Sequence, residues 1–214
     1  MSIGSVPAEQ RVVLDDVAWS TYLALVNNSD GRRKRIAYDQ GLMEITAPSK
    51  LHETAARIIG RMLDCLTEEL GIEVCSVKST TFKRDDQQRG FEADESYYIA
   101  NAAVIRDLDE IDLAIHPPPD LVIEVDISRS SMNKFTIFGG IGVSEVWRYD
   151  GEKLHVYVRR NETDYDEVEE SVVLPQFPLN EIPALIKQVR SLGETTAIRA
   201  FRKSIQKRFG PHES

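Results

Sequence analysis

Two acidic residues in strand-like segments give this sequence its clearest capacity for chemistry. Asp94 lies in the segment FEADESYYI, and Glu124 lies in HPPPDLVIEVDI, where apolar and acidic residues alternate. Because alternate side chains of a strand point to the same face, the second segment has one apolar face and one face that presents carboxylates. Carboxylate oxygens suit magnesium or manganese, which keep coordination positions for water and phosphate. Such a metal site can hydrolyse phosphodiesters, because the metal lowers the pKa of a bound water and neutralises charge on the phosphate.

The same spacing leaves a second interpretation open. Alternating acids also occur on the solvated face of an ordinary sheet, and strand spacing alone cannot show that Asp94 and Glu124 are neighbours. Asp120 and Asp126 share the face of Glu124. Asp120 follows three prolines and is expected to cap or solvate the start of the strand.

His52 is a further candidate for the site. It stands near the start of the clearest helical pattern, residues 50–70. At 100° per residue, His52 falls on the edge of the apolar stripe of this helix and Glu53 falls well off it. We therefore expect His52 to lean toward the sheet. It could activate water, or it could be a structural histidine held by hydrogen bonds.

The elements that would position these residues follow from hydrophobic periodicity and turn residues. Residues 15–27 predict a first helix, RIAYDQGLMEIT predicts a hairpin, and Gly71 is expected to end the helix over 50–70. Four strand-like runs are expected to form one mixed sheet, namely residues 73–84, 92–99, 119–127 and 143–158.

Shorter or later elements complete the predicted α/β fold. A short helix is expected near 101–113, and another in SSMNKFTIFGGIG with Ser130 or Ser131 as its N-cap. The run 143–158 is expected to be a hairpin with an Asp-Gly turn. Residues 162–170 predict a solvated loop or strand edge, and 181–209 predict an amphipathic helical region.

Composition limits the class of protein. The chain has 214 residues, 42% of them hydrophobic and 29% charged, which predicts a single domain over 1–214. It contains no run of about 18 apolar residues and no signal-peptide pattern, so we expect a cytoplasmic protein without a membrane partner. Cys65 and Cys75 lack zinc-site spacing. We also expect no small-molecule organic cofactor. The net charge of −9 argues against non-specific coating of nucleic acid but leaves room for a local site.

Several segments, taken together and in order, resemble the Uma-two family of endonuclease-like proteins, which have the restriction-endonuclease-like PD-(D/E)XK fold. These segments are GLMEITAPSKLHE, FKRDDQQRGFEADESYYI, PPPDLVIEVDISRSS, Lys134 and GVSEVWRYDGEKLHVY. The resemblance covers about residues 12–180. It implies a mixed central sheet flanked by helices, with an N-terminal helix and hairpin. It also implies that Asp94 is the first acid of the nuclease motif and Glu124 the second.

The sequence departs from the superfamily pattern at one position that matters for activity. The superfamily has a lysine two residues after the second acid, whereas this chain has Asp126. Lys134, on the following helix, is the natural substitute for that lysine, and its other interpretation is a solvated surface lysine. Asp126 is either a third metal ligand or a surface acid that disables the site. Ala93-Asp94 likewise replaces the usual Pro-Asp pair.

These features predict a magnesium- or manganese-dependent endonuclease that acts on DNA. Asp94 and Glu124 are the expected metal ligands, Lys134 is expected to assist catalysis, and His52 is a supporting candidate. The alternatives are a catalytically silent DNA-binding or assembly module with the same fold, and a purely protein-binding role. We also expect a homodimer, from the apolar stripe of residues 181–209 and from the tendency of restriction-like nucleases to pair.

Overall fold

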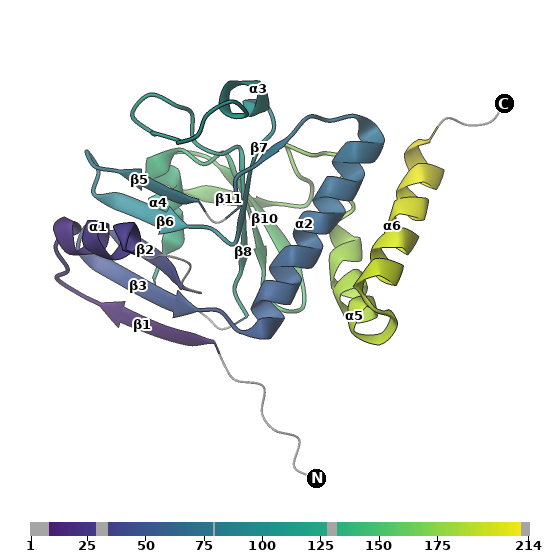
Figure 1. Ribbon diagram of the computed structural model, residues 1–214, viewed down its shortest axis with the longest axis horizontal. Helices are drawn as coiled ribbons and strands as arrows, with labels where there is room; N and C mark the ends of the chain where they lie inside the picture. Colours follow the sequence, from purple (N-terminus) through teal and green to yellow (C-terminus); the bar gives the residue numbers. More distant parts are fainter. Residues whose placement is uncertain (1–8, 29–33, 79, 128–131, 211–214) are drawn as a thin grey trace, which may run out of the picture.

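A computed structural model describes residues 9–28, 34–78, 80–127 and 132–210. Its strands form two sheets, with helices packed on both (Figure 1). The five-stranded sheet is antiparallel throughout and has the order β1 (Gln10–Leu14), β3 (Leu42–Ala47), β2 (Arg35–Asp39), β6 (Arg89–Glu92), β5 (Thr81–Arg84). The predicted hairpin is therefore confirmed as β2 and β3.

The six-stranded sheet is mixed, as predicted for the central sheet. Its order is β11 (Tyr165–Val168), β10 (Leu154–Arg159), β9 (Glu145–Tyr149), β8 (Leu121–Val125), β7 (Glu95–Tyr98), β4 (Cys75–Ser76). Among these strands, only β8 and β9 pair in parallel, and helix α4 (Lys134–Ile141) connects them. Strand β8 is buried on both faces, so its acids do not lie on an open, solvated face.

Helix α2 (Lys50–Leu70) covers one face of the six-stranded sheet. Ser49 caps its N-terminus, because its side chain accepts a hydrogen bond from the amide of His52. Gly71 ends it in the left-handed conformation at a φ of 65°. The predicted core residues Ile59, Met62, Leu63 and Leu66 are fully buried against the sheet.

Two C-terminal helices, α5 (Ile182–Leu192) and α6 (Glu194–Phe209), lie beside α2 on the side away from the five-stranded sheet (Figure 1). Their apolar residues, including Ile186, Ile198 and Phe201, belong to the same core cluster as α2. The apolar stripe on which the homodimer expectation rests is therefore buried within one chain. Among the described helices, none is long and apolar enough to cross a membrane.

The smaller helices cover the remaining surfaces of the sheets. Helix α1 (Trp19–Asn27) packs Tyr22 into a cluster with β2 and β3, and α4 packs between the two sheets. A single helical turn, α3 (Ala102–Ile105), follows β7, and the 3-10 turn η1 (Leu179–Glu181) precedes α5.

The expectation of one sheet for all four strand-like runs is wrong. The run 73–84 divides into β4, in the six-stranded sheet, and β5, in the five-stranded sheet. Lys78 adopts a positive φ of 48° between them, which breaks the extended chain. The run 92–99 does form a strand of the six-stranded sheet, β7, although its first residue, Glu92, ends β6 of the five-stranded sheet. Asp94, expected within a strand, stands at the passage between the sheets.

Some predicted helix bounds are also wrong. The first helix begins at Trp19 rather than residue 15, because Asp16 has a positive φ of 55° and the amide of Val17 donates to the carbonyl of Gly41. The helix expected over 101–113 is limited to α3. The N-cap of α4 is Asn133, whose side chain accepts from the amide of Phe135. Ser130 and Ser131 lie outside the described residues.

Candidate active site

Asp94 lies where the chain crosses from β6 to β7, at the junction of the two sheets. Its Oδ2 accepts a hydrogen bond of 2.8 Å from the amide of Val125 on β8, and its Oδ1 lies 2.8 Å from Nε2 of His52 on α2. Burial raises the pKa of Asp94, but His52, the Val125 amide and Lys134 together outweigh burial and hold that pKa below its ordinary value. Asp94 is thus a buried carboxylate fixed from two sides.

Glu124 is the second buried acid, on central strand β8. Its Oε2 accepts a hydrogen bond of 2.7 Å from Nζ of Lys134, the first residue of α4. Burial raises the pKa of Glu124 and Lys134 lowers it, while the neighbouring Asp94 carboxylate raises it further, so the pKa lies above its ordinary value. The two acids therefore share one electrostatic environment.

Lys134 carries a charge inside this environment. Burial lowers its pKa, but Glu124, Glu44 and Asp94 outweigh burial and raise it. Nζ lies 3.8 Å from Oε1 of Glu44 on β3, in addition to its contact with Glu124. The structure thus places Lys134 among three acids rather than on a solvated surface.

His52 lies between two carboxylates. Its Nδ1 is 2.9 Å from Oε1 of Glu9, and its Nε2 contacts Asp94. Burial lowers the pKa of His52, but Asp94 and Glu9 outweigh burial and raise that pKa to about 9. The imidazole is therefore protonated at neutral pH and cannot accept a proton. Glu53, by contrast, points outward with a side chain that is 48% exposed.

Asp126 is held by two arginines. Its Oδ1 lies 2.8 Å from NH2 of Arg11 on β1, and its Oδ2 lies 2.9 Å from NH2 of Arg148 on β9. Arg11 also reaches Glu9 and Glu44, at 3.1 and 3.4 Å. The charge of Asp126 is thus compensated on both oxygens, which makes it a poor ligand for a metal ion in this arrangement.

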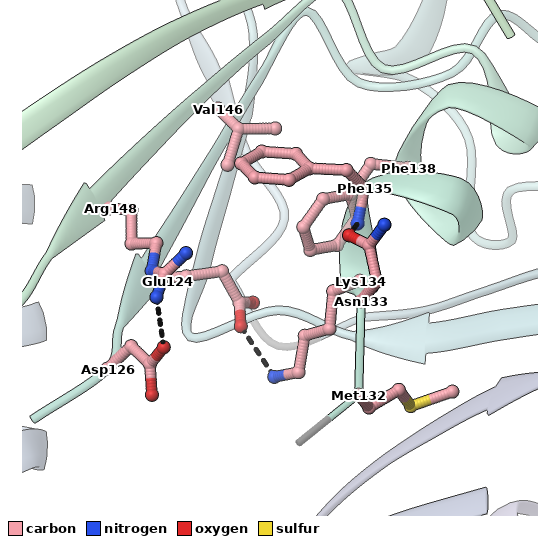
Figure 2. A pocket seen from close by; sticks show the side chains of 9 residues that line it. All are labelled: Glu124, Asp126, Met132, Asn133, Lys134, Phe135, Phe138, Val146 and Arg148. Carbon is pink, nitrogen blue, oxygen red and sulfur yellow. Dashed lines mark hydrogen bonds and ion pairs between the residues drawn. The ribbon is translucent and has the colours of Figure 1, made fainter. Parts of the chain in front are cut away.

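A cavity of about 270 Å³ opens beside Glu124. Figure 2 shows Glu124 between Arg148 on one side and Lys134 on the other, with Val146, Phe135 and Phe138 forming an apolar wall above them. The cavity therefore gives access to the Glu124–Lys134 pair and joins charged groups to an aromatic surface.

The donor set suits a hard divalent cation. Within the described part of the chain, no three His, Cys, Asp or Glu side chains are arranged as a metal site. Two carboxylates are nevertheless enough for magnesium, which commonly keeps several water ligands and binds one or two carboxylates plus substrate phosphate. Burial is the largest cause of the raised pKa of Glu124, and repulsion by the Asp94 carboxylate adds to it; a shared cation would relieve that repulsion.

The structure brings the four sequence-predicted residues into one network. Asp94, Glu124 and Lys134 interact electrostatically, and His52 contacts Asp94. Asp120 stands directly before β8, as expected, but it is buried rather than solvated, and it accepts hydrogen bonds from the amides of Ile99 and Asn101, just after β7.

Five residues of the network were missed from the sequence, namely Glu9, Arg11, Arg35, Glu44 and Arg148. Arg35 lies 3.7 Å from Asp94, and Arg148 contacts Asp126. Glu9 directly precedes β1, Arg11 lies on β1 and Glu44 lies on the adjacent β3, and the pairing of these strands brings the three residues together at the site. Glu44 does lie in one of the segments that carry the family resemblance, GLMEITAPSKLHE. Glu9 and Arg11 have no local signal.

Comparisons with known proteins identify a family whose model matches most of the chain. The model of the family Uma2, described as "Putative restriction endonuclease", matches residues 19–189. A solved structure from Anabaena variabilis ATCC 29413, described as "a putative nuclease belonging to DUF820", is 15% identical; the match covers 85% of this chain and 99% of that chain, with a TM-score of 0.48. None of the curated proteins compared with the sequence matches it.

Proposed function

The chain belongs to the Uma2 family of restriction-endonuclease-like proteins, and from that membership and the site we propose that it hydrolyses phosphodiester bonds of DNA with a magnesium or manganese ion. Asp94 and Glu124 would hold the ion, and Lys134 would assist the reaction. The family match supports the nuclease class. The choice of DNA and of metal rests on the chemistry of the site.

One observation carries the proposal. Lys134 stands ten residues after Glu124 and on another element, yet its ammonium donates to the Glu124 carboxylate at 2.7 Å. A protonated lysine next to two buried acids is the group that the superfamily pattern places two residues after the second acid. Lys134 would therefore supply the positive charge that the superfamily lysine provides and that the acidic Asp126, at the position of that lysine, cannot provide.

The residues of the site would have separate roles in hydrolysis. A divalent ion bound by the two acids would lower the pKa of a bound water and neutralise charge on the phosphate. Lys134 would place its fixed positive charge against a phosphate oxygen, where the surrounding burial strengthens the attraction. His52, being protonated, would not act as a base; it would hold the Asp94 carboxylate in position, as a positioning residue.

Cleavage of supercoiled plasmid tests the proposal. The wild type should cut the plasmid only when Mg²⁺ or Mn²⁺ is added. Asp94→Asn or Glu124→Gln should lower the rate at least about a hundredfold, because either change removes a carboxylate ligand. Lys134→Ala should lower turnover by about ten- to a thousandfold while sparing metal binding, because its charge acts on the transition state.

Asp166→Asn provides the matched control. Asp166 is an acid on β11 whose side chain is 62% exposed, and its ion-pair partner Arg160 is an exposed residue 3.6 Å away. This variant should cut at the wild-type rate. Metal-dependent cleavage that survives both Asp94→Asn and Glu124→Gln in folded protein would show that the site has been placed wrongly.

The contacts of Asp126 favour a second candidate function, a catalytically silent DNA-binding module. Asp126 stands at the superfamily lysine position and is bound to Arg11 and Arg148. A silent module should shift labelled DNA in a gel, lose affinity steeply as salt rises, and cut nothing with either metal. Measuring binding and cleavage on the same DNA separates the two candidates.

A further inference from the structure

The cavity beside Glu124 has an aromatic wall that is held rigidly. Phe135 of α4 packs against Tyr157 and Tyr165, with ring centroids 4.8 and 5.1 Å away, and meets Phe138 edge-on. Phe138 in turn is buried against Phe91 of the five-stranded sheet. A wall supported from behind in this way stays in place and offers a fixed apolar surface to a planar group.

Two cations stand at the polar side of the cavity. Lys134 lies beside Glu124, and Arg148 has a side chain that is 38% exposed and bound through NH2 to Asp126. Each acid in the cavity is thus already paired with a base. A divalent ion at Glu124 would make the balance positive, and an anionic phosphate would then be attracted.

Asn133 adds a polar group that can distinguish hydrogen-bonding edges. Its side-chain oxygen accepts from the amide of Phe135 as the N-cap of α4. This bond fixes the orientation of the side chain and uses none of the amide NH₂ donors, which can therefore donate to a ligand. Asn133 lines the same cavity as Phe135 and Arg148.

The size of the cavity limits its occupant. At about 270 Å³ it falls just below the range of ~300–1,000 Å³ typical of pockets for drug-sized ligands. A volume of this size suits one base with its attached sugar. A base within a duplex would have to leave the stack to enter it.

We propose that this cavity binds one unpaired nucleotide of a DNA strand, with the base against the Phe135 wall and a neighbouring phosphate between Arg148 and Lys134. The inference rests on the proposed nuclease function, because Glu124 and Lys134 line both the cavity and the proposed catalytic centre. The nucleotide in the cavity would therefore lie next to the bond that is cut. The preferred substrate is DNA with an unpaired or easily unpaired nucleotide.

Cleavage of matched oligonucleotides tests the substrate preference. Two labelled duplexes would differ only by one extra, unpaired nucleotide. With Mg²⁺, the wild type should cut next to the unpaired nucleotide about tenfold faster than it cuts the paired duplex, since the cost of unstacking and unpairing is already met. Equal cleavage of both duplexes would overturn the proposal while leaving the nuclease function intact.

A second readout does not depend on cleavage. The unpaired position would carry 2-aminopurine, whose fluorescence changes when the base moves between stacked environments, and Ca²⁺ would replace Mg²⁺. Binding of the wild type should change the fluorescence. Asn133→Asp, which keeps an N-cap but removes the amide donor, and Arg148→Gln should each weaken binding about fivefold or more.

Arg160→Gln is the control for lost charge, because Arg160 is 67% exposed and lies outside the cavity. It should bind as the wild type does. If Arg160→Gln weakens binding as much as Arg148→Gln, general charge explains the binding and the cavity assignment fails. If the fluorescence signal depends on Arg148 but no DNA is ever cut, the cavity assignment stands and the nuclease proposal fails.

Discussion

At the scale of residues, the distinctive group of this site is a histidine between two acids. Nδ1 of His52 is 2.9 Å from Glu9 and Nε2 is 2.8 Å from Asp94, and both side-chain partners are almost fully buried. The acids raise the pKa of His52 to about 9, above the ordinary value of 6.5. The proton on His52 therefore stabilises the folded chain.

This arrangement predicts a particular dependence of stability on pH. A raised pKa in the folded state gives stability that is complete below pH 6.5 and is lost as the pH rises through about 9. The free energy of unfolding of the wild type should therefore fall by about 1–3 kcal/mol between pH 6.5 and pH 9.5 from this group. Denaturant unfolding at a series of pH values measures the change.

Two variants separate His52 from other titrating groups. His52→Gln should lose most of that pH-dependent fall, whereas His155→Gln, which changes a histidine paired with Glu167 and Asp150, should retain it. A wild-type curve that is flat from pH 6.5 to 9.5, or a fall that His52→Gln leaves unchanged, would contradict the assigned charge of His52.

Residues differ in how far the sequence could place them. Helical periodicity alone predicted that His52 points inward and Glu53 outward, because the 100° step between them follows from the geometry of a single helix. The family resemblance singled out Lys134, which periodicity could not distinguish from a solvated lysine. The partners of Asp126 could not be foreseen, since Arg11 lies 115 residues away in the chain.

At the level of elements, the edge strand β1 links the two sheets through its residue Arg11. Through its pairing with β3, it brings Arg11 next to Glu44 and across to Asp126 on the other sheet. Burial lowers the pKa of Arg11, but Asp126, Glu9 and Glu44 raise it above its ordinary value. The arginine thus connects the N-terminal strand to the central strand.

Removing Arg11 should be costly because it leaves acids buried without their cation. We predict that Arg11→Met lowers the free energy of unfolding by about 3–5 kcal/mol. Adding Asp126→Asn should recover part of the loss, with a coupling energy of about 1–3 kcal/mol in the double-mutant cycle. Denaturant unfolding of the four proteins gives the coupling. Strictly additive losses would mean that the Arg11–Asp126 contact contributes no stability.

The elements themselves were predicted best where the pattern is long and local. Helix α2 was foreseen with its bounds, because its apolar stripe and Gly71 are local features. The division of 73–84 into two strands was not foreseen, because the β-branched strand pattern continues through Lys78, whose positive φ interrupts the extended chain. Beyond the two hairpins, the sequence did not reveal which strands pair, because those pairing partners lie far apart in the chain.

At the scale of the whole molecule, the site lies where the two sheets meet. Asp94 is at the crossing between them, Glu124 lies on the central strand with Asp126 just after its end, and Glu44 comes from the five-stranded sheet. Helices α5 and α6 extend the core cluster of α2 and the six-stranded sheet on the side that faces away from the five-stranded sheet (Figure 1). Any movement of one sheet against the other would therefore change the distances in the site.

The oligomeric state is a prediction at this scale. The stripe on α5 and α6 is buried within the chain, so only the tendency of restriction-like nucleases to pair still supports a homodimer. Light scattering after size exclusion, at micromolar concentration, should give twice the 24.2 kDa mass of one chain. A monomer mass that persists as the concentration is raised would end this prediction.

We propose that Asp94 and Glu124 share one divalent cation, and anomalous scattering from a manganese-soaked crystal would locate that ion. We predict an anomalous difference peak at about 2.1 Å from a carboxylate oxygen of each acid, with Lys134 turned away from Glu124 or toward water on the ion. The peak should be absent from Glu124→Gln crystals soaked in the same way. A fully soaked wild-type crystal with no peak between the two acids, or with its only peak elsewhere, would contradict the account.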